Sequence, residues 1–281
     1  MSAYRFCRTD DIGLLVDALN RCWSPHAPGE PPMTPAAFKR SIRDLQIWCS
    51  SCMVAFSGSE PIGVLIGAKR PSGTLIHRIA VHPDHLRQGH GRHLLTSLSS
   101  KLSILGPPRL CAEVPETLAA AVALFDACGY VQESVLTDYV LPWEDSEQRH
   151  EDPRGRFVIP VTIDDLAANG LLEEGHPQTC WERSLETLTA RKGDIAGLAV
   201  ATEERIEAYI LYVKTTAEIM SLRTLIDDGG IRLKQLLSRL GVGRFRFPKV
   251  HPAEISKELL ETLGFRPAGE HLLYAGKARA N

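Results

Sequence analysis

The chain has 281 residues, of which 44% are hydrophobic and 23% are charged, and its formal net charge is −2. This composition is typical of a globular protein, and the length suggests two domains. It excludes the basic surface of a nucleic-acid-binding protein, and no apolar run approaches the ~20 residues of a membrane span. Residues 1–6 resemble a strand rather than a signal peptide, so we expect a cytoplasmic protein that contacts neither nucleic acid nor membrane.

Predicted elements follow one another closely through the first half of the chain. A helix begins at Thr9-Asp10-Asp11, and after the proline-rich loop 24–33 a second helix begins at Thr34-Pro35. The later elements are strands at 53–57, 62–68 and 74–81, a helix at 91–103, a strand at 110–114, a helix at 117–128, and short strands near 131–134 and 137–141.

The second half repeats the first. Thr162-Ile163-Asp164-Asp165 matches the first helix start, and the segment 259–265 matches 124–130. Residues 143–156 are polar and lie next to Pro142, which indicates a linker. The sequence therefore predicts two tandem α/β (α+β) domains, 1–142 and 157–281, each a mixed central sheet flanked by helices.

Seven cysteines are scattered along the chain. An odd number without regular spacing argues against a disulfide framework and fits a reducing compartment. Cys49 and Cys52 have C-x-x-C spacing, but no second pair of metal ligands follows. We interpret them as half-buried thiols leading into a strand, and we expect no metal site.

The segment 79–92 carries the clearest chemical signal. A strand ends at Val81, and a loop that contains Gly89 and Gly91 then leads into an amphipathic helix. The first turn of a helix leaves its N–H groups unpaired, glycines let an anion approach the backbone, and the helix dipole adds positive charge. These properties predict a cradle for a diphosphate, to which Arg87 and Arg92 add charge.

The residues around these glycines follow the pattern Val-His-Pro-x-x-x-Arg-Gln-Gly-x-Gly-Arg-x-Leu-Leu. This pattern resembles the acetyl-CoA loop of the GNAT superfamily of N-acetyltransferases. The helix ending in Gly129-Tyr130 resembles a second hallmark of that family, and the order of elements fits over residues 3–142 and more faintly over 157–277. The resemblance implies that the pantetheine arm pairs with the strand before the loop and that the diphosphate sits on the loop. The implied cofactor-binding residues are Ile79, Ala80, Val81, Arg87, Gln88, Gly89, His90, Gly91, Arg92 and Phe125.

The sequence departs from this family at several positions. Leu86 replaces the usual Gln or Arg of the loop, a small loss because backbone groups bind most of the phosphate. Phe125 replaces the tyrosine that usually protonates the leaving thiolate, and Leu118 replaces a frequent asparagine. A thiol with a pKa near 8.5 leaves with modest help, so we expect weakened activity, with Tyr139 or a water molecule as the substitute donor.

Two residues are candidates for the general base that an ammonium substrate needs. Glu113, on the strand after the loop helix, matches a catalytic glutamate of some family members. A solvated carboxylate at a strand end is the alternative reading. His77, on the strand that leads to Val81, is the second candidate, and a strand histidine without a catalytic role is its alternative.

The corresponding stretch of the second half, 221–232, has no Val-x-Pro and no G-x-G. It carries adjacent Asp227 and Asp228, which would repel an anion. We therefore expect a degenerate domain without a cofactor loop. Its expected roles are to cover the first domain, to shape the substrate pocket or to form a homodimer.

The leading hypothesis is direct transfer of an acetyl group from acetyl-CoA to an amine of a small molecule or peptide. Backbone N–H groups near Val81 would hold the oxyanion, and the loop 24–33 would line the acceptor side. The alternative is a non-catalytic acyl-CoA-binding or sensor protein, which Phe125 and Leu118 favour. A doubly wound nucleotide-binding enzyme ranks far below, because the G-x-G-x-x-G after the first strand is missing.

Overall fold

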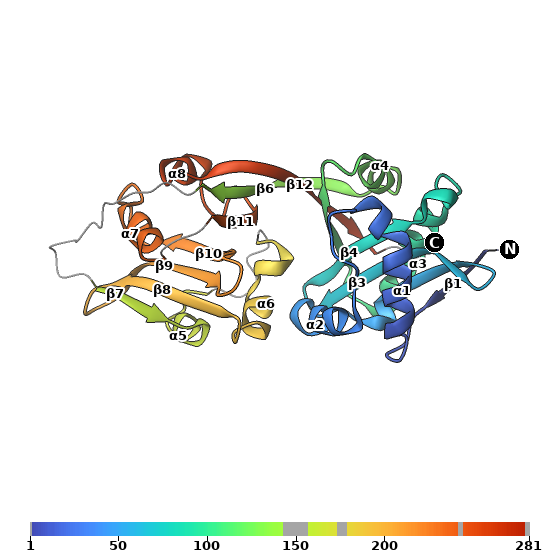
Figure 1. Cartoon of the computed structure of the whole chain (residues 1–281), viewed down its shortest axis with the longest axis horizontal. Helices are drawn as coiled ribbons and strands as arrows, with labels where there is room; N and C mark the ends of the chain where they lie inside the picture. The colour runs from blue at the N-terminus through green and yellow to red at the C-terminus, as the bar shows by residue number, and fades with distance from the viewer. Residues whose placement is uncertain (1, 143–156, 173–178, 241–243, 279–281) are drawn as a thin grey trace. The chain divides into compact units, whose positions relative to one another are not determined.

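The computed structural model describes residues 2–142, 157–172, 179–240 and 244–278. Contacts divide the chain into unit 1, Met1–Ser134 with Leu272–Asn281, and unit 2, Val135–His271. Both units combine sheet and flanking helices, as the sequence predicts (Figure 1). None of the helices in the described ranges is long and apolar enough to cross a membrane.

The units differ from the expected division at 1–142 and 157–281. Strand β6 (Val131–Leu141) begins in unit 1 and continues into unit 2, and β12 (Arg266–Lys277) begins in unit 2 and ends in unit 1. The two short strands expected near 131–134 and 137–141 are one strand, because the intervening residues contain no turn-forming Gly, Pro, Asn or Asp. The predicted linker 143–156 lies outside the described residues.

The sheet of unit 1 has the order β1-β2-β3-β4-β5-β12. Strands β1 to β4 are antiparallel, and β5 is parallel to β4. The strands of unit 1 before β6 are β1 (Ser2–Phe6), β2 (Met53–Ser57), β3 (Glu60–Arg70), β4 (Gly73–Val81) and β5 (Arg109–Pro115). Its helical elements are α1 (Ile12–Cys22), η1 (Ser24–His26), α2 (Pro35–Leu45), η2 (Cys49–Ser51), η3 (Pro83–His85), α3 (His90–Leu105) and α4 (Ala119–Ala127).

Local signals in the sequence explain these helices. The hydroxyl of Thr34 accepts a hydrogen bond from the N–H of Ala37, which confirms the predicted cap of α2. On α3 a stripe of leucines faces the sheet and packs with Phe125 of α4 and with alternate strand residues. The α3 stripe consists of Leu94, Leu95, Leu98 and Leu102.

The end of β12 is built into the core of unit 1, and Figure 1 shows the C-terminus in the same unit as the N-terminus. The ring of Tyr274 stacks on Phe125 with 5.5 Å between centroids and 16° between planes. Its hydroxyl donates to Asp126 Oδ1 at 2.9 Å. A Cβ on Gly276 would lie 2.9 Å from the ring of Tyr130, so strand and ring are in close contact. Residues far from the first half in sequence therefore complete its core.

Unit 2 contains a four-stranded antiparallel sheet of order β10-β9-β8-β7, and β6 lies between β12 and β11. Its remaining strands are β7 (Phe157–Val161), β8 (Ile195–Ala201), β9 (Ile206–Val213), β10 (Ile219–Thr224) and β11 (Phe245–Val250). Its helical elements are α5 (Ile163–Ala168), η4 (Trp181–Arg183), α6 (Leu185–Ala190), α7 (Ile231–Arg239) and α8 (Lys257–Thr262). One parallel bridge, Glu218↔Arg246, leads from the start of β10 to β11, as in the β4–β5 pair of unit 1.

The thiols of Cys49 and Cys52 are buried and free, immediately before β2. Burial raises the pKa of both thiols, so they are poor nucleophiles. In the described part of the chain no three His, Cys, Asp or Glu side chains come together in a way that could hold a metal ion.

Candidate functional site

Strands β4 and β5 separate soon after they meet. Their ladder pairs Thr74 with Leu110 and Leu75 with Cys111, and the described residues contain no later pair between them. Beyond this point β4 runs on to Val81 and β5 to Pro115. These parts of the two neighbouring strands are not paired with each other, and we call the space between them the gap.

The edge of β4 that borders this gap exposes main-chain groups. The N–H of His82 donates to the oxygen of Ile62 on β3 at 2.9 Å. Because hydrogen-bonded and non-bonded residues alternate in an antiparallel ladder, the N–H and C=O groups of Ile79 and Val81 point away from β3. Both groups of Ile79 and the N–H of Val81 can pair with an extended ligand in the gap, and the side chain of Ala80 is buried.

The loop after β4 has the geometry of an anion cradle. Arg87 and Gly89 have positive φ angles of 62° and 86°, which turn successive N–H groups outward. The first hydrogen bond into α3 runs from His93 N–H to Gly89 O at 3.0 Å. In the described chain no hydrogen bond uses the main-chain N–H groups of residues 87–92. Free N–H groups at the start of a helix can bind an anion such as a phosphate.

Gly89 and Gly91 of the loop have different structural roles. A Cβ on Gly89 would meet nothing within 4 Å, so the space above this residue is open. A Cβ on Gly91 would lie 3.0 Å from Leu124 of α4, so this glycine lets α3 and α4 pack closely. Gly89 thus gives an anion access, and Gly91 fixes the helix behind the loop.

The other loop residues divide into exposed and buried ones. Arg87, Gln88 and Arg92 are exposed, so both guanidinium groups are available to a bound anion. His90 is buried, and its Nδ1 lies 2.6 Å from the hydroxyl of Tyr4 on β1. Burial, with the nearby imidazoles of His85 and His93, lowers the pKa of His90. This imidazole anchors the start of α3 to the sheet.

Glu113 and His77 lie at matching positions of β5 and β4. Each is two residues along its strand from the last ladder pair, Leu75 with Cys111. His77 is the extra residue of a β-bulge, because the pairing with β3 passes from Arg78 directly to Ile76. Both side chains are half-buried. Both candidate bases therefore lie just beyond the point at which β4 and β5 stop pairing.

Phe125 and Tyr139 are not placed as the sequence analysis expects. The ring of Phe125 is 1% exposed and is enclosed by Tyr130 and Tyr274, so it does not line an open site. Tyr139 lies opposite Phe247 in the core of unit 2. The reason is the continuous β6, which carries Tyr139 out of unit 1.

A polar cluster of Trp23, His26, Glu30 and Arg78 near the end of β4 was not found from the sequence. The guanidinium of Arg78 lies 4.8 Å from the ring of Trp23 and pairs with Glu30 at 2.8 Å. Glu30 also accepts a hydrogen bond from Trp23 Nε1. His26 Nε2 lies 2.8 Å from the oxygen of Val81, a partner 55 positions along the chain. The loop 24–33 therefore reaches the end of β4, and the carboxylate of Glu30 is paired with Arg78 and Trp23.

In unit 2 an internal carboxylate takes the place of an anionic ligand at the matching helix start. Gly230 precedes α7 with a φ of 85°, as Gly89 precedes α3. Asp228 accepts hydrogen bonds from the N–H groups of Gly230 (2.9 Å) and Arg232 (3.0 Å). Asp228 thus does more than repel anions, because it satisfies the donors that an anion would use.

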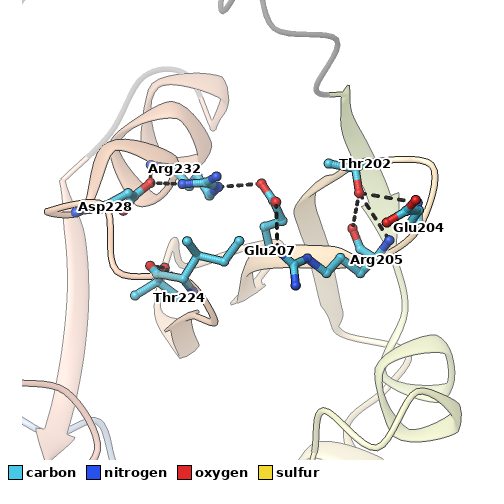
Figure 2. Close-up of polar contacts among 9 residues, drawn as sticks. Thr202, Glu204, Arg205, Glu207, Thr224, Asp228 and Arg232 are labelled. Carbon is cyan, nitrogen blue, oxygen red and sulfur yellow. Dashed lines mark hydrogen bonds and ion pairs between the residues drawn. The ribbon is translucent and has the colours of Figure 1, made fainter.

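A buried ion-pair network holds this carboxylate, and Figure 2 shows its side chains. Arg232 donates to Asp228 Oδ2 and to Glu207 Oε2, both at 2.6 Å. Burial alone would raise the pKa of Asp228, but hydrogen bonds from Arg232 and from the main chain lower it. The carboxylate is therefore ionised at neutral pH and stays in place.

Replacing Asp228 by alanine should lower the free energy of unfolding by about 2–4 kcal/mol, because Arg232 and two N–H groups lose a partner. Denaturant unfolding at pH 7 measures this, with the exposed neighbour Asp227→Ala as a control expected within about 0.5 kcal/mol. Because the pKa of Asp228 is lowered in the folded state, the stability that its carboxylate contributes is lost as the pH falls through that pKa. The free energies of unfolding of the two variants should therefore converge in acid. Equal stability at pH 7 would contradict the assignment.

Comparison with known proteins shows that the chain is similar in sequence to acetyltransferases. The model of the Acetyltransferase (GNAT) family matches residues 15–130. The [ribosomal protein bS18]-alanine N-acetyltransferase of Escherichia coli is 39% identical over 64 residues, 23% of this chain and 43% of that protein. Mycothiol acetyltransferase of Thermomonospora curvata is 28% identical over 194 residues, 69% of this chain and 54% of that protein. The chain thus spans about half the length of the curated relatives it matches.

Solved structures extend the likeness to the whole chain. A tandem GNAT protein from the clavulanic acid biosynthesis pathway superposes with a TM-score of 0.66 at 16% identity, over 100% of this chain and 99% of that one. This likeness shows the fold, and the family match lies within unit 1. Residues 15–130, within unit 1, match the model of the GNAT acetyltransferase family, and the chain as a whole has the fold of a tandem GNAT protein.

Proposed function

We propose that the protein is an acetyl-CoA-dependent N-acetyltransferase whose site lies in unit 1. The observation that carries this proposal is the combination of the β4–β5 gap with the unpaired N–H groups of residues 87–92. The gap admits an extended pantetheine arm, and the loop holds the diphosphate. Unit 2 has no such role, because Asp228 occupies its helix start.

In this proposal an amine attacks the thioester carbonyl directly. Acetyl-CoA supplies the electrophilic carbon, and the N–H groups of Ile79 and Val81 face the gap where an oxyanion would develop. Glu113 accepts the proton of the attacking amine, and His77 is the second candidate for this role. The relatives are named for an alanine of a ribosomal protein and for mycothiol, so peptide termini and small amines are both acceptor classes to test.

Release of CoA thiol, measured across peptides with N-terminal alanine and a set of small primary amines, tests the function. We expect amine-dependent thiol release, and Glu113→Gln should lower kcat by about 10²-fold or more while acetyl-CoA still binds. Glu116→Gln, an exposed carboxylate just beyond β5, is the control. Tight binding of acetyl-CoA without turnover on any amine would instead favour a non-catalytic acyl-CoA sensor.

A further inference from the structure

An acid is missing from unit 1 at the place where the family's tyrosine would act. Phe125 cannot donate a proton, and Tyr139 lies in unit 2. The tyrosines of unit 1 are engaged elsewhere. The hydroxyl of Tyr4 contacts His90, that of Tyr274 donates to Asp126, and the ring of Tyr130 packs in the core.

The imidazole of His26 lies at the gap instead. The oxygen of Val81 points away from β3, and Nε2 of His26 lies 2.8 Å from it. A carbonyl only accepts, so Nε2 carries a proton, and in a neutral ring Nδ1 then bears the lone pair. In the described chain Nδ1 of His26 has no hydrogen-bond partner.

Short-range contacts fix this ring. His26 is the last residue of η1, and its own N–H donates to the oxygen of Trp23 at 2.8 Å. Trp23 is held in turn by Arg78 and Glu30. The ring is therefore anchored to the strand edge at one nitrogen and is open at the other.

We propose that His26 is the general acid that protonates the leaving thiolate, an inference that rests on the proposed acetyl transfer. The amine nitrogen bonds to the carbonyl carbon, and the carbon–sulfur bond breaks with its electron pair on sulfur. Glu113 takes the proton from the amine. The imidazolium of His26 gives its Nδ1 proton to sulfur, while Nε2–H stays on Val81. His26 regains a proton from solvent, so the products are the N-acetyl amine and the free thiol of CoA.

His26→Ala and His26→Asn in the full chain test the proposal, with the best amine of the panel as acceptor. We expect kcat to fall about 100-fold in both, with acetyl-CoA affinity by calorimetry unchanged. Added imidazole should restore the activity of His26→Ala, because a free imidazole can supply the proton that the variant side chain cannot. Asparagine keeps an N–H donor for Val81, which separates proton transfer from loop anchoring. His93→Ala, another imidazole of unit 1, should behave as wild type.

Three results would overturn the proposal while leaving acetyl transfer intact. They are unchanged kcat in both variants, a loss of acetyl-CoA affinity that accounts for the lost activity, and a fall in kcat that imidazole does not restore. Wild-type protein that binds acetyl-CoA but acetylates none of the amines would overturn both this inference and the proposed function.

Discussion

Gly89→Asp should abolish acetyl-CoA binding without destabilising the fold. Asp tolerates a positive φ better than most residues, and a carboxylate at a helix N-terminus is favourable. The new charge would stand in the open space above the loop and take the donors that a diphosphate needs, as Asp228 does in unit 2. Losing two charge-assisted hydrogen bonds corresponds to about 4 kcal/mol, or roughly 1000-fold in Kd.

The matched variant Gly89→Asn separates charge from shape. It has nearly the same size and the same tolerance of positive φ, but it adds no charge. Calorimetry should therefore show a smaller loss for Asn than for Asp, and the melting temperature of Gly89→Asp should equal or exceed that of Gly89→Asn. If Gly89→Asp binds acetyl-CoA like the wild type, the loop is not the phosphate site.

Tyr274→Ala should destabilise unit 1 although residue 274 belongs to the final strand of the chain. The ring is 2% exposed and stacks on Phe125. Removing a buried aromatic side chain costs about 3–5 kcal/mol, whereas Tyr274→Phe loses only the hydrogen bond to Asp126, about 1 kcal/mol. Denaturant unfolding of the wild type and of both variants measures these two losses in the free energy of unfolding.

The same strand arrangement predicts how fragments behave. Residues 1–142 alone lack the segment 272–277 beside β5, so we expect this fragment to be insoluble or unfolded. Co-expression with 157–281 should restore a folded complex, because each fragment carries a strand that completes the other unit. A stable, folded 1–142 fragment would show that the exchanged strands are dispensable.

Much of the fold is readable from short stretches of sequence. Periodicity places α3 and its leucines, Thr34-Pro35 places the start of α2, and the glycines of the loop mark the backbone that turns toward an anion. These features depend on neighbours within a few residues, and such local chemistry is what a sequence pattern records.

The remaining features depend on partners distant in the chain. The contact between His26 and Val81 joins positions 55 apart, and Tyr274 meets Asp126 across 148 positions. No periodicity links such pairs. The passage of β6 and β12 from one unit to the other also has no local signal, so the sequence does not indicate that contacts divide the chain within these two strands.

The repeated half shows how one fold can retain or lose a ligand site. Gly230 has nearly the φ of Gly89, and each helix start approaches a leucine of the following helix, Leu259 or Leu124. The backbone is therefore preserved in both copies. What differs is whether a side chain of the protein itself satisfies the free N–H groups, as Asp228 does.

A crystal structure of the protein with CoA tests the central claim most directly. We predict one coenzyme per chain, with diphosphate oxygens within about 2.7–3.2 Å of main-chain nitrogens of residues 87–92 and the arm between β4 and β5. A coenzyme seated at the start of α7, or density on the loop with the gap between β4 and β5 closed, would contradict the assignment of the site to unit 1.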